Sequence, residues 1–157
     1  MLNEYLEFSR NQKNEETEVI SVNNLIEEII KKYDGKEINV HFEENIKINM
    51  RPNAIKRCLT NLIDNGLAYG KKVEIIFKKK IRDLIIFVDD NGPGIPENEY
   101  KNVMKPFYRI DKSRGQNKSG VGLGLSIAND IIRSHGGNVS LEKSPLSGLR
   151  VKISLPL

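Results

Sequence analysis

The sequence predicts a single α/β domain built as a sandwich of helices and strands. Its 157 residues are enough for one domain of ordinary size with a real core. Runs with helical periodicity and runs with strand periodicity are mixed along the chain. These runs do not alternate strictly, which favours an α/β sandwich over a doubly wound parallel sheet.

The N-terminal segment differs from the rest of the chain. The apolar residues of MLNEYLEFSR have helical spacing, but this helix has no start signal of its own. We therefore interpret it as the end of a longer helix, followed by a polar linker. The predicted division is a helix end plus linker at residues 1–17 and a compact domain at residues 18–157.

In the first half of the domain, Asn23 or Asn24 is the expected cap of an amphipathic helix. Two nearly alternating runs follow that helix, and we expect them to pair with each other. The expected elements are a strand at 18–22, a helix at 23–33, strands at 38–42 and 46–50, and a helix from Pro52 to about Ala68.

In the second half, two strand-like runs form a predicted β-hairpin that turns near Arg82 and Asp83. A polar, glycine-containing stretch at 108–120 lacks periodicity and indicates a mobile loop. The expected elements are strands at 71–80 and 84–90, a short helix at 96–104, a helix at 122–137, and strands at 138–143 and 150–157.

The charge, the cysteine content and the apolar runs of the chain limit the kinds of protein it can be only slightly. The net charge of +4 is mild, and the cluster at 78–80 fits a solvated hairpin end, so the charge by itself supports no conclusion about nucleic acid or membranes; we expect no nucleic acid partner and a chain that is not itself membrane-bound. The single cysteine, Cys58, cannot form an internal disulfide and falls in an apolar helical pattern. No apolar run has the length of a membrane span, and no signal peptide is recognised at the N-terminus.

Three stretches have the composition of ligand-binding sites. In the first, Asn61 and Asn65 are four apart and share one helix face, with Arg57 one turn earlier. Their amide oxygens either coordinate Mg²⁺ and orient phosphate, or simply face water.

The second stretch, DDNGPGIP at 89–96, follows an apolar strand. Asp, Asn, Gly and Pro specify a turn. A carboxylate at the edge of a core is costly unless it has a partner, so either Asp89 or Asp90 faces water, or one of them binds a ligand.

The third stretch, GVGLGL at 120–125, lies between the polar loop and a helix, where backbone amides can approach phosphate. It does not match the dinucleotide fingerprint, because its third glycine is one position early. It does not match a Walker A loop either, because no Gly-Lys-Ser/Thr follows.

Taken in order, Asn61 and Asn65, the DxGxG motif at 90–94, PFYRID at 106–111 and the GxGxG motif at 120–124 resemble the ATP-binding domain of sensor histidine kinases in the GHKL superfamily. The resemblance covers about residues 18–157 and is nearest to the osmosensor EnvZ type. It implies a Bergerat-type two-layer α/β sandwich, a mixed sheet with helices on one face. MLNEYLEFSR resembles the end of the second helix of the dimerisation domain.

The resemblance also implies roles for individual residues. Asp90 would accept a hydrogen bond from the adenine amino group, Asn65 would bind Mg²⁺, and Asn61 would support the phosphates. Phe107 would anchor a lid, and Arg109 would reach a phosphate. The remaining implied nucleotide contacts are Tyr69, Gly92, Gly94, Ile95, Gly120, Val121, Gly122, Leu123, Gly124 and Leu125.

Two positions depart from the family pattern, and the phosphoacceptor is missing. Gly66 stands where Ala is common, a tolerable change, and Ala68 stands where this type usually has Lys or Arg. His41 lies in a predicted strand and His135 precedes the glycine pair that ends a helix, so neither has the context of an acceptor histidine.

The implied function is transfer of the γ-phosphoryl group of ATP to a histidine on a dimerisation domain outside this chain. The implied partners are that domain and a response regulator downstream, and the implied location is cytoplasmic, as part of a membrane-anchored sensor. Two alternatives remain open at this point: a nucleotide-sensing module without kinase activity, and a serine kinase of the anti-sigma type with the same fold.

Overall fold

The computed structural model of the chain describes residues 15–108 and 124–157. The elements in chain order are β1 (Glu18–Ser21), α2 (Val22–Ile30), β2 (Glu37–Phe42), β3 (Lys47–Met50), α3 (Pro52–Tyr69), β4 (Lys72–Lys80), β5 (Asp83–Asp90), the 3₁₀ turn η1 (Glu97–Glu99), α4 (Tyr100–Val103), α5 (Gly124–Ser134), β6 (Asn138–Lys143) and β7 (Leu149–Pro156). The predicted N-terminal helix and most of the predicted loop at 108–120 lie outside the described residues.

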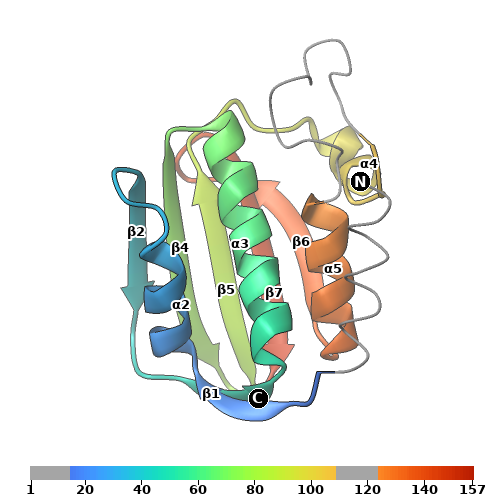
Figure 1. Ribbon diagram of the computed structural model, residues 1–157. Helices are drawn as coiled ribbons and strands as arrows, with labels where there is room; N and C mark the ends of the chain where they lie inside the picture. Colours follow the sequence, from blue (N-terminus) through green and yellow to red (C-terminus); the bar gives the residue numbers. More distant parts are fainter. Residues whose placement is uncertain (1–14, 109–123) are drawn as a thin grey trace.

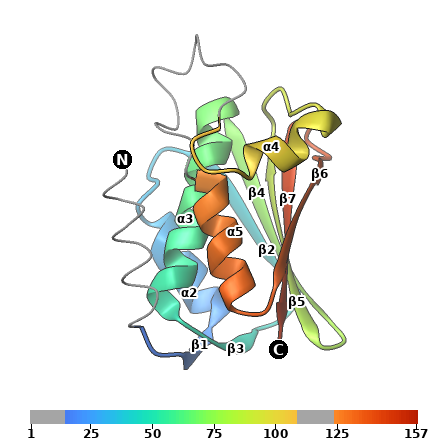
Figure 2. The same ribbon diagram turned by 90° about the vertical axis from the view of Figure 1, so that its right-hand side faces the viewer.

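The main sheet has five strands in the order β2-β4-β5-β7-β6, and β1 and β3 form a separate two-stranded sheet. β2 runs parallel to β4, and the other neighbours in the main sheet are antiparallel. Helices α2, α3 and α5 lie against one face of this sheet (Figure 1). Figure 2 shows the sheet almost edge-on, with no described element on its other face. The predicted mixed sheet with helices on one face is confirmed.

The predicted pairing between the strands at 38–42 and 46–50 is wrong. β2 pairs in parallel with β4, and β3 pairs antiparallel with β1. Alternation identified both strands correctly, but it carries no information on the partner strand. Val40 lies opposite Ile75 in the parallel register, which places the apolar side of β2 on the helix-covered face.

The predicted cap of the first helix is also wrong by a few residues. Ser21 is the N-cap of α2, and its hydroxyl accepts a hydrogen bond from the Asn24 backbone amide at 3.3 Å. The Asn23 side chain instead accepts a hydrogen bond from the Ile46 backbone amide at 3.2 Å. Asn23 therefore ties the helix to the segment that precedes β3.

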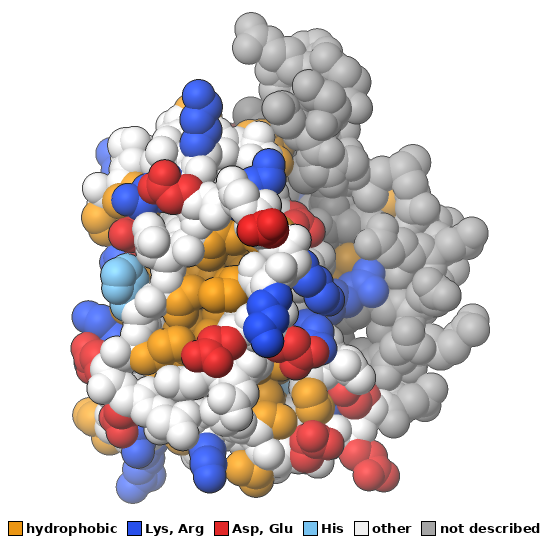
Figure 3. Space-filling view, turned by 60° about the vertical axis from the view of Figure 1, so that its left-hand side comes forward, with side chains coloured by type: hydrophobic (Ala, Val, Ile, Leu, Met, Phe, Trp, Pro, Cys, Tyr) orange, Lys and Arg blue, Asp and Glu red, His pale blue; other side chains and the backbone are white. Residues whose placement is uncertain are grey.

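The predicted hairpin is confirmed, with Lys80 opposite Asp83 and a two-residue connection. Alternate residues of β4 and β5 face the helices and are fully buried, including Phe77, Leu84 and Ile86. Phe42 of the edge strand β2 stacks on Phe77, with ring centroids 4.8 Å apart. Hydrophobic side chains remain visible on the side of the molecule that Figure 3 brings forward. Among the described helices, none is long and apolar enough to cross a membrane.

Candidate nucleotide-binding site

Helix α3 carries the two candidate asparagines, and a residue far away in sequence caps it. Pro52 stands at the first helical position, and the Arg51 side chain makes no capping bond. The Glu15 carboxylate accepts hydrogen bonds from the backbone amides of Asn53 (2.8 Å) and Ala54 (3.0 Å). A carboxylate is favourable at a helix N-terminus because of the exposed amides and the helix dipole. Glu15, which precedes the predicted start of the compact domain, therefore contributes to the fold of α3.

Asn61 and Asn65 lie one helical turn apart on α3, and both are half-buried. Leu62 and Ile63 point from the other side of the helix into the core and are essentially inaccessible to solvent. Among the described residues, neither asparagine side chain has a hydrogen-bond partner. The two carboxamides are therefore available to water or to a ligand, and both alternatives of the sequence analysis remain compatible with the structure.

Asp90 is the last residue of β5 and faces the helix layer, with 6% of its surface exposed. Its Oδ1 atom accepts hydrogen bonds from the backbone amides of Gly92 (2.9 Å) and Leu149 (3.2 Å). Burial raises the pKa of this carboxyl group, although the two amide bonds partly oppose the effect. No described residue donates a hydrogen bond to Oδ2, so within the described part of the chain this oxygen of a largely buried carboxyl group has no partner.

The Asp90 carboxylate lies beside α3. A Cβ atom built on Gly66 would be 3.4 Å from Asp90 Cβ and 3.9 Å from Oδ2. Gly66 directly follows Asn65, so the asparagine pair and the DxGxG motif form one site. The same Cβ would be only 2.9 Å from a methyl group of Val73, so the alanine that is common in the family does not fit here without a shift.

Asp89, by contrast, does not face solvent, and this corrects the expectation for the two carboxylates. The Asp89 side chain lies on the other face of the sheet, and only 1% of it is exposed. Arg150 of the neighbouring strand β7 binds it with two hydrogen bonds, at 2.7 Å from Nε to Oδ1 and 2.9 Å from Nη2 to Oδ2. The guanidinium also lies over the ring of Phe87, 4.1 Å from its centroid. Asp89 is therefore saturated by protein contacts.

The turn after Asp90 is fixed by Asn91, which the sequence analysis did not single out. Its Oδ1 atom accepts hydrogen bonds from the backbone amides of Lys71 (2.7 Å) and Lys72 (2.9 Å). These amides belong to the connection between α3 and β4. An Asn directly after a strand in a turn sequence was the available signal, but its partners are about 20 residues away.

Two glycines of the motif are required by the backbone. A side chain at Gly92 would lie 2.7 Å from the Tyr69 carbonyl oxygen. Gly94 has a φ of +78°, a conformation that other residues rarely adopt. Gly92 therefore packs against the end of α3, whereas Gly94 lies beside the loop residues Ser147 and Gly148.

The loop between β6 and β7 completes the site and was missed by the sequence analysis. The Leu149 amide binds Asp90, and a Cβ atom on Gly148 would lie 2.1 Å from Asp90 Oδ1. Only a residue without a side chain allows this close approach. The signal was the GLR sequence at 148–150, whose role depends on a strand 59 residues earlier.

The remaining predicted residues divide into three groups. Ile95 packs against the core, whereas Tyr69 and Phe107 are 49% and 47% exposed, and Phe107 has a φ of +67°. Gly124 begins α5, and a Cβ atom there would lie 3.9 Å from the Asn61 carbonyl oxygen, while the Leu125 side chain is buried in the core. Outside the described residues lie Arg109, Gly120, Val121, Gly122 and Leu123.

Each of the two histidines of the chain contacts another protein group. His135 Nε2 accepts a hydrogen bond from the Arg51 backbone amide at 3.0 Å, and Nδ1 lies 2.8 Å from the Ile131 carbonyl oxygen. Burial lowers the pKa of His135, and this side chain joins the end of α5 to the start of α3. His41 is an exposed residue of β2 and lies 3.7 Å from the Glu74 carboxylate.

Comparison with known proteins places this geometry in context. The sensor histidine kinase CpxA of Escherichia coli K12 is 36% identical over the whole chain, which spans 36% of that relative's length. The structure of the histidine kinase domain of the E. coli osmosensor EnvZ matches with a TM-score of 0.68 and 30% identity, covering 89% of this chain and 88% of that one. The ATP-binding domain of PrrB from Mycobacterium tuberculosis matches with a TM-score of 0.74 and 25% identity, covering 89% and 96%.

The family model described as histidine kinase-, DNA gyrase B-, and HSP90-like ATPase matches residues 50–157. This range includes α3 with its asparagines, the end of β5, the start of α5 and the β6–β7 loop. Because the matched range covers most of the domain and all parts of the candidate site, the chain belongs to the histidine kinase-, DNA gyrase B- and HSP90-like ATPase family and is a nucleotide-binding domain.

Proposed function

We propose that the chain is the ATP-binding catalytic domain of a two-component sensor histidine kinase. In this role it transfers the γ-phosphoryl group of ATP to a histidine on a dimerisation domain outside the chain. The observation that carries the proposal is the buried Asp90 carboxylate, one oxygen of which has no partner among residues 15–108 and 124–157, beside a helix with two available carboxamides. A response regulator downstream and a cytoplasmic location, as part of a membrane-anchored sensor, belong to the same proposal.

Asp90 is the proposed adenine determinant. Two backbone amides hold its Oδ1 atom, so the orientation of Oδ2 is fixed before a ligand binds. The adenine amino group donates to Oδ2, and little reorganisation is needed. Gly92 and Gly94 let the chain turn beside the base, and Ile95 and Tyr69 provide apolar contacts.

Asn65 and Asn61 are the proposed phosphate-side residues. Asn65 holds Mg²⁺ through its amide oxygen, a ligand type that suits this hard ion when phosphates and water supply the other ligands. The ion neutralises charge on the phosphates. Asn61 lies next to the N-terminus of α5 and orients the phosphates together with Gly120, Val121, Gly122, Leu123, Gly124 and Leu125. Phe107 anchors the lid, and Arg109 contacts a phosphate.

In the proposed reaction a histidine nitrogen of the partner domain forms a bond to the γ-phosphorus, the bond to the bridging oxygen breaks, and ADP leaves. The chain contributes positioning and charge stabilisation, which is most of what phosphoryl transfer requires of a protein. The nucleophile comes from the partner, because His135 is committed to α3 and α5 through its hydrogen bonds and His41 lies on the edge strand β2, which β4 separates from β5 and Asp90.

The test mixes the chain with its own dimerisation domain and radiolabelled Mg·ATP. We expect an acid-labile label on a histidine of the added domain and no label on the chain alone. Asn65→Ala should abolish labelling, whereas Asn53→Ala, an exposed residue of the same helix, should not. An acid-stable serine label, or nucleotide binding with no transfer at all, would replace this proposal with one of the two alternatives.

A further inference from the structure

The end of the sheet opposite Asp90 has an exposed feature that the proposed function does not use. There the turn between β4 and β5 projects beyond the sheet (Figure 2). Ile81, the first residue of the two-residue connection, is 89% exposed and has a φ of +56°. Glycine or asparagine is the usual choice at such a position, because a β-branched side chain is strained at positive φ.

Ile81 is therefore unfavourable for the folded domain in two ways. It strains the backbone, and it exposes a large apolar side chain to water. A second exposed apolar residue, Leu157, lies beside it, because its backbone amide donates a hydrogen bond to the Arg82 carbonyl at 2.8 Å. Backbone strain combined with exposed apolar surface indicates an interaction site rather than a stability device.

Positive charge surrounds these two apolar residues. Lys78, Lys79, Lys80 and Arg82 are all exposed, and the acid in the same stretch is Asp83. Among the described residues, none of these four cations forms an ion pair. We call residues 78–83 together with Leu157 the basic tip.

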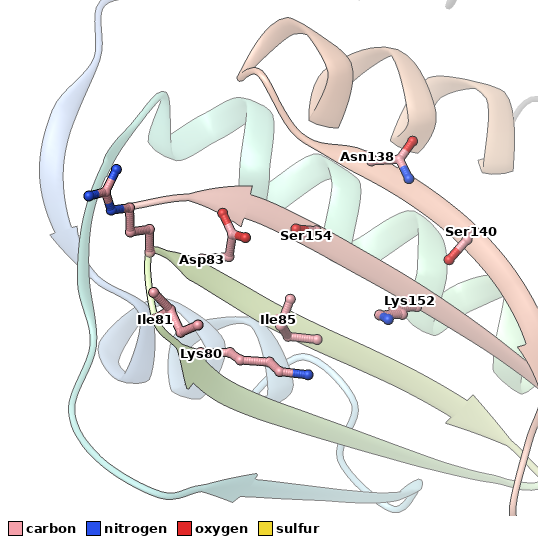
Figure 4. A pocket seen from close by; sticks show the side chains of 9 residues that line it. Lys80, Ile81, Asp83, Ile85, Asn138, Ser140, Lys152 and Ser154 are labelled. Carbon is pink, nitrogen blue, oxygen red and sulfur yellow. The ribbon is translucent and has the colours of Figure 1, made fainter.

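A hollow of about 560 Å³ lies beside the basic tip on the face of the sheet that no described helix covers (Figure 4). Ile85 lies on the strand between Lys80 of β4 and Lys152 of β7, so two ammonium groups flank an apolar floor. Hydrogen-bonding side chains also line the hollow, namely Asn138, Ser140 and Ser154, and so do the Arg82 guanidinium and the Asp83 carboxylate, so the cations in the lining outnumber the single acid. Ammonium, hydroxyl and amide groups of this kind bind a phosphate or carboxylate group.

We propose that the basic tip docks reversibly on an anionic membrane surface. Ile81 and Leu157 enter the boundary between headgroups and acyl chains, the cations contact the headgroups, and Lys80 and Lys152 hold a headgroup anion in the hollow. A lipid surface fits better than an acidic protein, because the apolar residue is at the apex of a projecting turn and a bilayer needs no complementary shape. The nucleotide site, at the other end of β5, stays open.

The test measures binding of the chain to sedimenting vesicles of phosphatidylcholine, with or without 40% phosphatidylserine. We expect at least tenfold tighter binding to the anionic vesicles, weakening as salt rises from 0.05 to 0.3 M. Ile81→Asn should weaken it at least fivefold while the melting temperature stays the same or rises, because Asn tolerates positive φ. Loss of binding without loss of stability separates docking from folding.

Charge is tested with a matched pair of variants. Lys79→Glu/Lys80→Glu should reduce vesicle binding at least tenfold, whereas Lys31→Glu/Lys32→Glu, the same change on an exposed end of α2, should reduce it less than threefold. ATP affinity should be unchanged in all these variants, so the outcome does not depend on the proposed function. Three outcomes would each overturn the membrane proposal. They are equal loss of vesicle binding in both double variants, no preference for anionic vesicles, and equally tight binding to a decaglutamate peptide in solution.

Discussion

Asp89 and Asp90 are adjacent in sequence, but their side chains lie on opposite faces of the sheet and differ in their hydrogen-bond partners. Both are buried at the end of β5, with 1% and 6% of their surface exposed. On the open face, Asp89 is paired with Arg150 through both oxygens. On the helix-covered face, two backbone amides hold one oxygen of Asp90, and no residue in the described ranges donates a hydrogen bond to the other. The comparison separates a carboxylate that stabilises the fold from one that we propose accepts a hydrogen bond from a ligand.

The largest expected effect comes from breaking the structural pair. Arg150→Ala leaves Asp89 buried without a counter-charge, and removing one partner of a buried pair costs about 3 kcal/mol of unfolding free energy. Chemical denaturation measures this loss. Lys152→Ala, on the same strand and face, should cost less than about 1 kcal/mol. The double variant Asp89→Leu/Arg150→Leu should recover much of the loss; a double variant as unstable as the single one would contradict this account.

Asp90→Ala should affect ATP affinity more than it affects the stability of the fold. The loss of a charged hydrogen bond of about 1.5–3 kcal/mol weakens ATP binding at least tenfold. Stability should fall less than in Arg150→Ala, because the variant removes an incompletely paired buried carboxylate while leaving the amides of Gly92 and Leu149 without their acceptor. Calorimetry with Mg·ATP and a melting curve on the same sample measure both effects. Unchanged affinity in a folded variant would contradict the assignment of adenine to Asp90.

A substitution at the proposed phosphate end of the site should change ATP affinity by a smaller amount. Ala68 is half-buried, three residues after Asn65 and on nearly the same face of α3. Ala68→Arg adds a charge-assisted hydrogen bond and should tighten ATP by about 1 kcal/mol, roughly fivefold. Adenosine affinity should barely change, because the Asp90 region is untouched. If Ala68→Arg has no effect and Arg109→Ala destroys ATP binding, the lid already fills the phosphate shell.

The smallest effect is the pH dependence that Asp90 produces. Its pKa in the folded chain is raised above the ordinary value of 3.8, so the folded state holds this proton more tightly than the unfolded state. The contribution of Asp90 to stability is therefore complete below that ordinary value and is lost as pH rises through the raised pKa. Nucleotide affinity should change in the opposite direction, because the ionised carboxylate is the better acceptor.

Asp90→Asn is the control for this titration. In this variant the dependence of both stability and affinity on Asp90 should disappear, and what remains is the titration of the nucleotide and of other groups. Thermal melts and ATP titrations between pH 4 and 6.5 measure the difference. Identical pH profiles for the wild-type chain and the Asn variant would show that burial of Asp90 has no functional consequence.

Much of the fold was determined by the sequence alone. Helical and alternating patterns predicted α3, the β4–β5 hairpin, α5 and β6, because each pattern records one buried face of a local element. The spacing of Asn61 and Asn65 placed them on one helix face, and the turn residues of DxGxG placed the turn directly after an apolar strand. The sequence also identified the family through the order of these motifs.

Only the tertiary structure decided which groups are paired. Arg150 saturates Asp89 from 61 residues away, and Asn91 and Leu149 fix the turn through contacts with other segments. The Glu15 carboxylate caps α3 from a position far away in the sequence, and β2 pairs with β4 rather than with β3. Periodicity shows which side of an element is buried. It does not show what lies against that side, because hydrogen bonds and ion pairs between distant segments depend on how the elements are packed together.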